Sequence, residues 1–457
     1  MRLKIINIPP ETIFIIIGLI YGLAFLFITP PFFVVPDEAY HFYKAYGISE
    51  GYVIPEKIGN EAGVSIPEYT LDTISASFNQ KINFEDVINS KVNINVNKNT
   101  EKFVDMSRFA VVTYPPVPYA VSALAIKLGV FFDLSPFVLL YMARFANFLI
   151  WFFLVYLAIK IIPVHKWVLL MIALMPMTIF EAASVSADSL TIGLSFLFIA
   201  YILRLALVNH NFTRTDFLII CVLGVLLALT KSIYVFILFL FLLIPTGKFP
   251  NYKKKYTIFS IILIPISLLS VGWVFLTNNL YKPYIANWSL NAQLAFVLNH
   301  PLNYLILLIK SFISYWVSYL ASFVGFLFVP FTFALVYFLI LIFVAILDKN
   351  EFKLSLRNKL VSLMIVLSSV FVIMTFDYLT WNPIGNNFII GVQGRYFIPI
   401  APILLFLLYN KREYIPIFNR NFPLKMNNIY KLMIIATIVI TLSFTLFMLF
   451  KFYHYQI

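Results

Sequence analysis

The sequence predicts an all-α polytopic membrane protein with about 11 transmembrane helices. Of its 457 residues, 61% are hydrophobic and only 12% are charged, whereas a soluble domain carries about 25% charged residues. Apolar runs recur with the length of about 20 residues that crosses a bilayer. Basic residues gather in alternate loops, which is the pattern of the positive-inside rule. Together these observations exclude a soluble globular domain.

Nine apolar runs are predicted to cross the membrane as single helices: 12–32, 136–160, 167–183, 189–208, 256–277, 331–347, 360–379, 395–410 and 430–450. A tenth run, 216–246, is interrupted by Thr230-Lys231-Ser232, so we expect two short helices that meet at this break. Two further stretches, 112–132 and 303–328, are ambiguous, because each could span the membrane or lie on it.

The charge distribution resolves this ambiguity. If both ambiguous stretches are interfacial or re-entrant helices on the outer face, every short basic loop falls on one side of the membrane. These loops are 1–11, 160–166, 204–214, 247–255, 348–359 and 411–431, and they hold more than half of the 33 Lys and Arg residues. We therefore predict a cytoplasmic N-terminus and an extracytoplasmic C-terminus. This topology accounts for the net charge of +13 without nucleic acid as a partner.

The chain is predicted to be a single membrane domain, 1–457. Residues 33–135 would form a large first extracytoplasmic loop with juxtamembrane helices, and 136–457 would complete the bundle. Within the first loop, residues 53–107 are predicted to form a polar lobe with one or two helices. Shorter outer loops are expected at 184–188, near Lys231, at 278–302 and at 380–394.

Asp37, Glu38 and His41 follow the first span and are the leading candidates for chemistry. Pro36 ends the preceding helix, and acidic groups at a membrane face are functional candidates by default. One carboxylate could act as a general base or, with the other, bind Mg²⁺ or Mn²⁺. The structural alternative is that one of them caps a helix over 39–46. His41 could be a ligand, a proton partner or an interfacial aromatic residue.

Arg144, Glu181 and Asp188 lie in or beside later spans. Arg144 is about two turns inside the span 136–160, and the two acids bracket the small residues 182–187. Charges at such depths are candidates for substrate binding or catalysis. The alternative is a buried ion pair between Arg144 and a carboxylate, which would fix helix packing.

Lys231 and Arg395 are basic residues on the outer side, against the cytoplasmic bias. Arg395 follows Gln393 in a glycine-containing stretch, and a guanidinium can bind two phosphate oxygens. Tyr114 precedes a proline-rich segment, after which a helix over 119–131 should lie along the membrane surface beside the first loop. We include Gln393 and Tyr114 among the candidate substrate-binding residues. The alternative for each basic residue is that it extends to lipid headgroups.

Several motifs resemble a known family when taken together and in order. They are PDEAYHFYKAYGISEG, YPPVPY, LLYMARFANFLIW, ALMPMTIFEAASVSADSLT, LALTKSIY and QGRYFIPIAPILL. The set resembles domain-of-unknown-function family 2142, which is thought to belong to the GT-C superfamily of membrane glycosyltransferases. The PDE motif is also similar to the start of the first outer loop in lipid A aminoarabinose transferases and protein O-mannosyltransferases. The resemblance does not cover 53–107 and 250–380.

The resemblance implies a GT-C-like fold and an inverting sugar transfer. By position, Asp37 would be the base or metal ligand, with Glu38 beside it and Asp188 as the second acid. The donor in such enzymes is usually a polyprenyl-phosphate-linked sugar.

These observations together predict a glycosyltransferase in the cell membrane, with its active site outside the cytoplasm. Its partners would be a polyprenyl-phosphate-linked sugar, a cell-envelope glycan or glycolipid acceptor and the surrounding membrane lipids. The absence of a nucleotide-binding loop fits a donor made elsewhere. The alternatives are a transporter or flippase of lipid-linked saccharides, and a structural partner in an envelope assembly. A transporter should show repeat symmetry, and the sequence shows no internal repeat.

Overall fold

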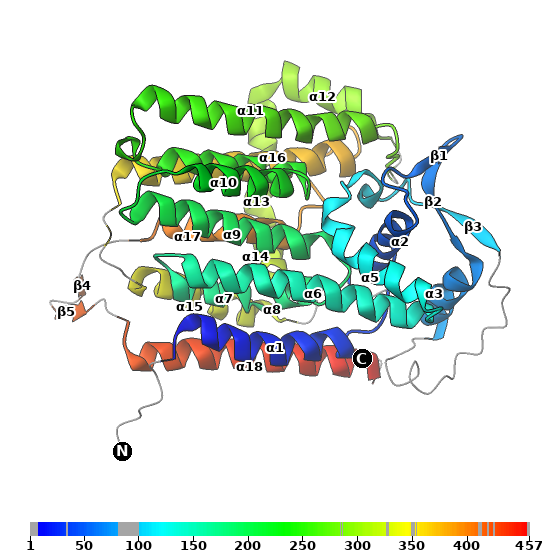
Figure 1. Ribbon diagram of the computed structural model, residues 1–457, viewed down its shortest axis with the longest axis horizontal. Helices are drawn as coiled ribbons and strands as arrows, with labels where there is room; N and C mark the ends of the chain where they lie inside the picture. Colours follow the sequence, from blue (N-terminus) through cyan, green and yellow to red (C-terminus); the bar gives the residue numbers. More distant parts are fainter. Residues whose placement is uncertain are drawn as a thin grey trace.

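Helices dominate the computed structural model, in which six helices are long and apolar enough to cross a membrane (Figure 1). The structure describes residues 8–32, 35–80, 100–283, 285, 287–325, 329–348, 352, 354–409, 414–417, 420–423 and 426–454. Within these residues the six long helices are α1 (Pro10–Ile28), α6 (Pro136–Ile161), α9 (Ala187–Leu207), α11 (Tyr252–Thr277), α16 (Leu356–Trp381) and α18 (Asn428–His454). Each matches a predicted span, so the prediction of a helical membrane protein is confirmed.

The other five predicted spans are shorter or broken helices. They are α7 (Lys166–Ala173) with α8 (Pro176–Ala182), α10 (Arg214–Ala228), the 3₁₀ helix η4 (Ser232–Leu243), α15 (Phe331–Leu347), and η6 (Gly394–Ile400) with α17 (Ala401–Phe406). The break at Lys231 lies where it was predicted. The run 167–183 divides because Pro176 starts α8, where its missing N–H costs nothing. The count of 11 spans stays a prediction.

The two ambiguous stretches both contain short helices. The first holds η2 (Ala110–Thr113), η3 (Val117–Tyr119) and α5 (Ala120–Phe131), so the helix expected after the prolines is confirmed. The second lies in α13 (Pro301–Ser314) and α14 (Trp316–Val324). The preceding α12 (Leu290–Asn299) meets α13 at a bend of 106°. Pro301 occupies the first position of α13, which explains why a new helix starts there.

The first loop contains a small sheet that the sequence analysis did not predict. After α2 (Glu38–Ser49), strands β1 (Glu56–Ile58), β2 (Glu61–Pro67) and β3 (Glu101–Asp105) form an antiparallel sheet in that order. The helix α3 (Glu68–Gln80) follows β2. Val64 is fully buried and lies where a Cβ on Gly47 would be 2.5 Å away. The sheet therefore packs closely on α2, and the expected lobe is part helix and part strand. Residues 81–99 lie outside the described part.

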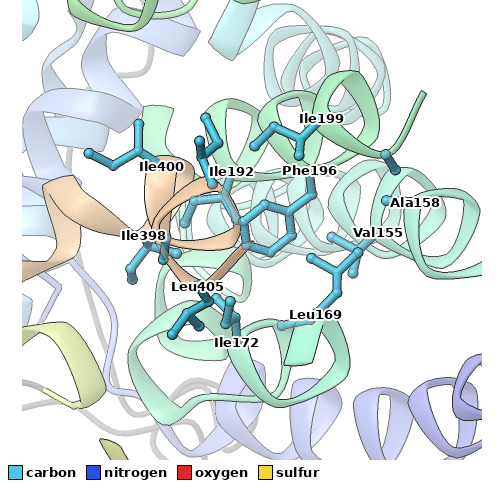
Figure 2. Close-up of a cluster of buried hydrophobic side chains, with 14 of the residues drawn as sticks. Val155, Ala158, Leu169, Ile172, Ile192, Phe196, Ile199, Ile398, Ile400 and Leu405 are labelled. Atoms are coloured by element: carbon cyan, nitrogen blue, oxygen red, sulfur yellow. The ribbon is translucent and has the colours of Figure 1, made fainter. Parts of the chain in front are cut away.

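Helix α9 forms the centre of the bundle. It contacts α6, α8, α10, η4 and η6, and 83% of its most apolar window is buried. Figure 2 shows Phe196 of α9 among aliphatic side chains from α6, α7, η6 and α17, including Val155, Leu169 and Leu405. These side chains are almost fully buried. A central helix with a polar first turn can hold charged groups at one end while its apolar length fixes their position.

Most of the segments predicted for the outer face meet at one end of the bundle, on the right of Figure 1, whereas α13 and α14 lie nearer its middle. Lys231, between α10 and η4, contacts Asp188 at the start of α9. Tyr281, after α11, donates a hydrogen bond to the carbonyl of Thr380 near the end of α16. Trp273 of α11 donates to a carbonyl of the first loop.

The basic loops lie at the opposite end. Lys166 pairs with Glu11 at 3.7 Å, and Lys248 donates to carbonyls at the C-terminal end of α9. Asp348 accepts hydrogen bonds from the first backbone N–H groups of α7. A two-stranded hairpin, β4 (Tyr414–Ile417) with β5 (Arg420–Pro423), also belongs to a basic loop. The structure thus separates the two predicted sets of loops to opposite ends.

Candidate functional site

Asp37 is an exposed carboxylate at this end of the bundle. It precedes the first turn of α2 and adopts a left-handed conformation, with φ of 61°. Aspartate tolerates this conformation better than most residues. Its side chain neither caps α2 nor accepts a hydrogen bond from any described residue. Surrounding protein raises the pKa of Asp37 by desolvation, against the opposing effect of Arg395 and Lys231. Asp37 is therefore an accessible carboxylate within electrostatic reach of two cations.

Glu38 and Arg144 form a buried ion pair. Arg144 donates from Nε and Nη2 to the two carboxylate oxygens of Glu38, at 2.8 and 2.5 Å, and both side chains are fully buried. The remaining guanidinium N–H groups donate to the carbonyls of Leu26, Thr29 and Pro30. The structure therefore favours the alternative considered for Arg144, an ion pair that fixes packing.

This pair also determines what Glu38 can do. Oε1 of Glu38 accepts a further hydrogen bond of 3.0 Å from the backbone N–H of Val185. Both oxygens of Glu38 are hydrogen-bonded and the side chain is fully buried against the Arg144 cation, so the geometry does not fit the suggested Mg²⁺ or Mn²⁺ site shared with Asp37. The described residues also contain no cluster of three or more His, Cys, Asp or Glu side chains that could hold a metal. Glu38 instead joins α1, α2, α6 and the α8–α9 turn.

Asp188, Glu181, Lys231 and Arg395 form a second charged cluster. Lys231 donates to Oδ1 of Asp188, and Arg395 donates to Oε1 of Glu181. Nη1 of Arg395 lies 3.7 Å from Oδ2 of Asp188, so the two pairs are linked. Each of the four side chains is less than a tenth exposed. Residues from three separate parts of the sequence are thus brought together as a buried network.

The α8–α9 turn places the two acids of this network. Ser186 donates to Oε2 of Glu181 at 2.7 Å, and its hydroxyl also caps α9 by accepting from the backbone N–H of Asp188. Asn147 of α6 donates to the carbonyls of Ser184 and Ser186. The small residues of this turn therefore accommodate α6.

Aromatic rings surround Lys231. Its Nζ lies 5.3 Å from the centre of the Tyr114 ring and 5.4 Å from that of Tyr396. A cation over an aromatic face is stabilised by the ring quadrupole. Tyr234 donates to the carbonyl of Tyr396, which ties η4 to η6. Tyr114, a candidate substrate-binding residue, thus lies at the charged cluster together with Tyr396, which was not among the candidates.

His41 is buried and faces Tyr119. Its Nδ1 lies 2.6 Å from the Tyr119 hydroxyl. Burial and, to a smaller extent, the nearby Lys231 lower the pKa of His41 to about 3. The imidazole is therefore neutral at physiological pH and forms one hydrogen bond with Tyr119. No described carboxylate forms a hydrogen bond with it.

Gln393, Gly394 and Gly391 shape the loop before η6. Oε1 of Gln393 is buried and accepts no hydrogen bond from the described residues. A Cβ on Gly394 would lie 1.9 Å from the carbonyl oxygen of Tyr319, so this glycine accommodates the backbone of α14. Gly391 has φ of 98°, a conformation that favours glycine. The space beside Gly394 is therefore filled by protein backbone.

Asp377 belongs to the same site and was not predicted. It lies in the last turns of α16, is 5% exposed, and interacts electrostatically with Lys231 and Arg395. The sequence contained a signal, because Asp377 is an acid near the outer end of the predicted span 360–379. The rule that selected Glu181 and Asp188 would have selected it as well.

The chain was compared with known proteins. A family model described as "predicted membrane protein (DUF2142)" matches residues 19–404. This range includes every site residue named above. The search of curated proteins and the search of solved structures found no match.

Proposed function

We propose that this chain, which belongs to the DUF2142 family of membrane proteins, is a glycosyltransferase that faces the extracytoplasmic side. The donor would be a polyprenyl-phosphate-linked sugar, and the acceptor a hydroxyl group of a cell-envelope glycan or glycolipid. The acceptor oxygen would form a bond to the sugar C1 while the bond from C1 to the phosphate oxygen breaks. The acceptor proton passes to a base, and the polyprenyl phosphate leaves with the bonding electrons.

The position of Asp37 is the observation that carries this proposal. It is an exposed carboxylate without a hydrogen bond from the described residues, and two buried cations, Lys231 and Arg395, interact with it electrostatically. Desolvation raises its pKa, which makes it a better general base than a fully solvated aspartate. Its left-handed backbone fits the tendency of unusual conformations to occur at functional sites.

Lys231 and Arg395 would bind the donor phosphate. Each retains donors beyond its carboxylate partner, because an ammonium has three N–H groups and a guanidinium has five. In Arg395 the buried Nε has no acceptor among the described residues. Lys231 also immediately precedes η4, whose first N–H groups lack partners within the helix. Cations and helix N–H groups would stabilise the phosphate charge that grows as the sugar leaves.

The remaining charged residues would position this machinery. Glu38, held by Arg144, would orient Asp37 through the adjoining backbone. Asp188 would hold Lys231, and Glu181 would hold Arg395. This division gives Asp37 the role of the base and leaves the buried acids as supports.

Activity in lipid tests the proposal. Purified protein in lipid nanodiscs would be incubated with a panel of radiolabelled polyprenyl-phosphate sugars and an envelope glycolipid fraction, with and without EDTA. Asp37→Asn should abolish donor consumption while the protein remains folded. The matched control is Asp133→Asn, which changes another exposed aspartate of the first loop with a left-handed φ, 53°. Activity within twofold of the unmodified protein is expected for this control.

Each result has a defined meaning. Transfer that Asp37→Asn leaves unchanged would overturn the role of Asp37. Donor that binds but stays intact in every condition would instead favour a transporter of lipid-linked saccharides. Loss of activity with EDTA would show that a metal takes part, which the geometry of Asp37 and Glu38 does not indicate.

A further inference from the structure

Asp377 is a buried carboxylate without a hydrogen-bond partner. Only 5% of the residue is exposed, and neither carboxylate oxygen accepts a hydrogen bond from a described residue. Burying a carboxylate in this way is costly unless a partner compensates for the lost hydration. Glu38, Glu181 and Asp188 are equally buried, but each of them has a hydrogen-bonded cation. Among the described buried acids of the site, Asp377 is therefore the one that lacks a hydrogen-bonded cation.

The surroundings hold Asp377 in a defined position. Asn382 donates from Nδ2 to the backbone carbonyls of Asp377 and Ile390, at 2.9 and 3.0 Å. The Asn382 side-chain oxygen accepts from the backbone N–H of Ile390, at 2.9 Å. A Cβ on Gly391 would lie 3.5 Å from Oδ1 of Asp377. The end of α16 and the loop before η6 are thus joined, and the carboxylate lies against that loop.

The charge balance argues against a phosphate beside Asp377. The charges of Lys231 and Arg395 interact electrostatically with Asp377, but the carboxylates that pair directly with them are those of Asp188 and Glu181. Asp377 has no hydrogen-bonded cation of its own, so a phosphate placed directly against it would meet an uncompensated carboxylate, whereas a phosphate at Arg395 meets the unpartnered Nε of that residue. Neutral hydroxyl groups suit the position, because each one can donate a hydrogen bond to a carboxylate. Gln393, two residues after Gly391, has a side-chain oxygen that also lacks a donor among the described residues.

We propose that Asp377 recognises the sugar of the donor by accepting hydrogen bonds from its hydroxyl groups, while Lys231 and Arg395 bind the phosphate. Gln393 contributes a second acceptor for the same sugar. This inference rests on the proposed function, and it makes Asp377 a residue for sugar specificity. Removing a charged acceptor that meets a ligand hydroxyl weakens binding by about tenfold or more.

Binding measurements separate this role from a structural one. Two probes would be compared by native mass spectrometry or thermophoresis in nanodiscs: a short-chain polyprenyl phosphate, and the same lipid carrying a sugar that the unmodified protein accepts. Asp377→Asn should weaken binding of the sugar-bearing lipid by about tenfold or more. It should leave binding of the bare polyprenyl phosphate within twofold, or strengthen it. The control is Asp348→Asn, which changes a buried aspartate at the other end of the bundle and should affect neither probe.

The outcomes are distinguishable from failure of the proposed function. If the unmodified protein binds neither probe, the proposed function fails. If it binds both probes and Asp377→Asn weakens them equally, Asp377 is a structural counterion and the inference is overturned. Equal binding of the sugar-bearing lipid before and after the change would overturn it as well. Gln393→Ala, which removes the second acceptor, should show the same selective loss if the two residues bind one sugar.

Discussion

Two adjacent acids, Asp37 and Glu38, have opposite environments. The Asp37 side chain is exposed and has no hydrogen bond from the described residues, whereas Glu38 is fully buried and engaged by Arg144 and Val185. Helix α2 begins between them, so the backbone turns Glu38 into the bundle and leaves Asp37 at its surface. Substitutions at neighbouring positions should therefore have different consequences, one on activity and the other on stability.

Glu38→Gln should destabilise the protein by about 3–5 kcal/mol, because it leaves the Arg144 charge buried and uncompensated. Equilibrium unfolding in a mixed-detergent titration would measure the change. The double variant Glu38→Gln with Arg144→Gln should lose less than the sum of the two single variants, since the two residues act on one interaction. Asp37→Asn serves as the control and should unfold like the unmodified protein. Additive losses in the double variant would contradict the role assigned to the pair.

Two helical elements approach each other closely at Gly394, where η6 packs on α14. Gly394→Ala would place Cβ 1.9 Å from the Tyr319 carbonyl oxygen and 2.4 Å from the Phe323 nitrogen. Backbone atoms cannot yield as a flexible side chain can, so η6 must shift, at a cost of about 1–3 kcal/mol. Arg395 is the next residue, so its pairing with Glu181 should weaken and transfer activity should fall.

Gly272→Ala provides the matched control for Gly394→Ala. Gly272 lies in α11, and a Cβ there would have no heavy atom within 4 Å. Alanine also favours a helix over glycine, so stability should be equal or slightly higher. Thermal unfolding and donor consumption, measured side by side, would decide. An unchanged Gly394→Ala protein would show that η6 and α14 do not pack as closely as described.

The sequence predicted elements well where one local signal was sufficient. The break at Lys231 and the helix after Pro118 follow directly from residue types that interrupt or redirect a helix. The β1–β2 hairpin was missed although Gly59-Asn60 separates its strands, and Gly59 has φ of 60°. A Gly-Asn pair between two short extended runs indicates a hairpin. The polar composition of 53–107 instead led to the prediction of a polar lobe with one or two helices.

The site was predicted less completely, since partners depend on tertiary contacts. Residue type and depth identified Glu38 and Arg144 as charged residues that needed an explanation. They could not show that these two residues, 106 positions apart, pair with each other. Asp377 was missed because the span that contains it was assigned on hydropathy alone.

At the scale of the whole molecule, the proposed function depends on the orientation of the bundle in the membrane, that is, on which end faces the outside. The structure puts the charged site at one end and the basic loops at the other, and the positive-inside rule predicts that the basic end faces the cytoplasm. The chain has a single cysteine, Cys221, so a Cys221→Ser background would report on introduced cysteines alone. Position 60 is exposed in the turn between β1 and β2, at the same end of the bundle as the site. Asn60→Cys should therefore react with a membrane-impermeant maleimide on intact cells. Lys253→Cys, exposed at the start of α11, should react only after the cells are permeabilised. The opposite labelling pattern would place Asp37 in the cytoplasm, where a donor and acceptor of the cell envelope could not meet it as proposed.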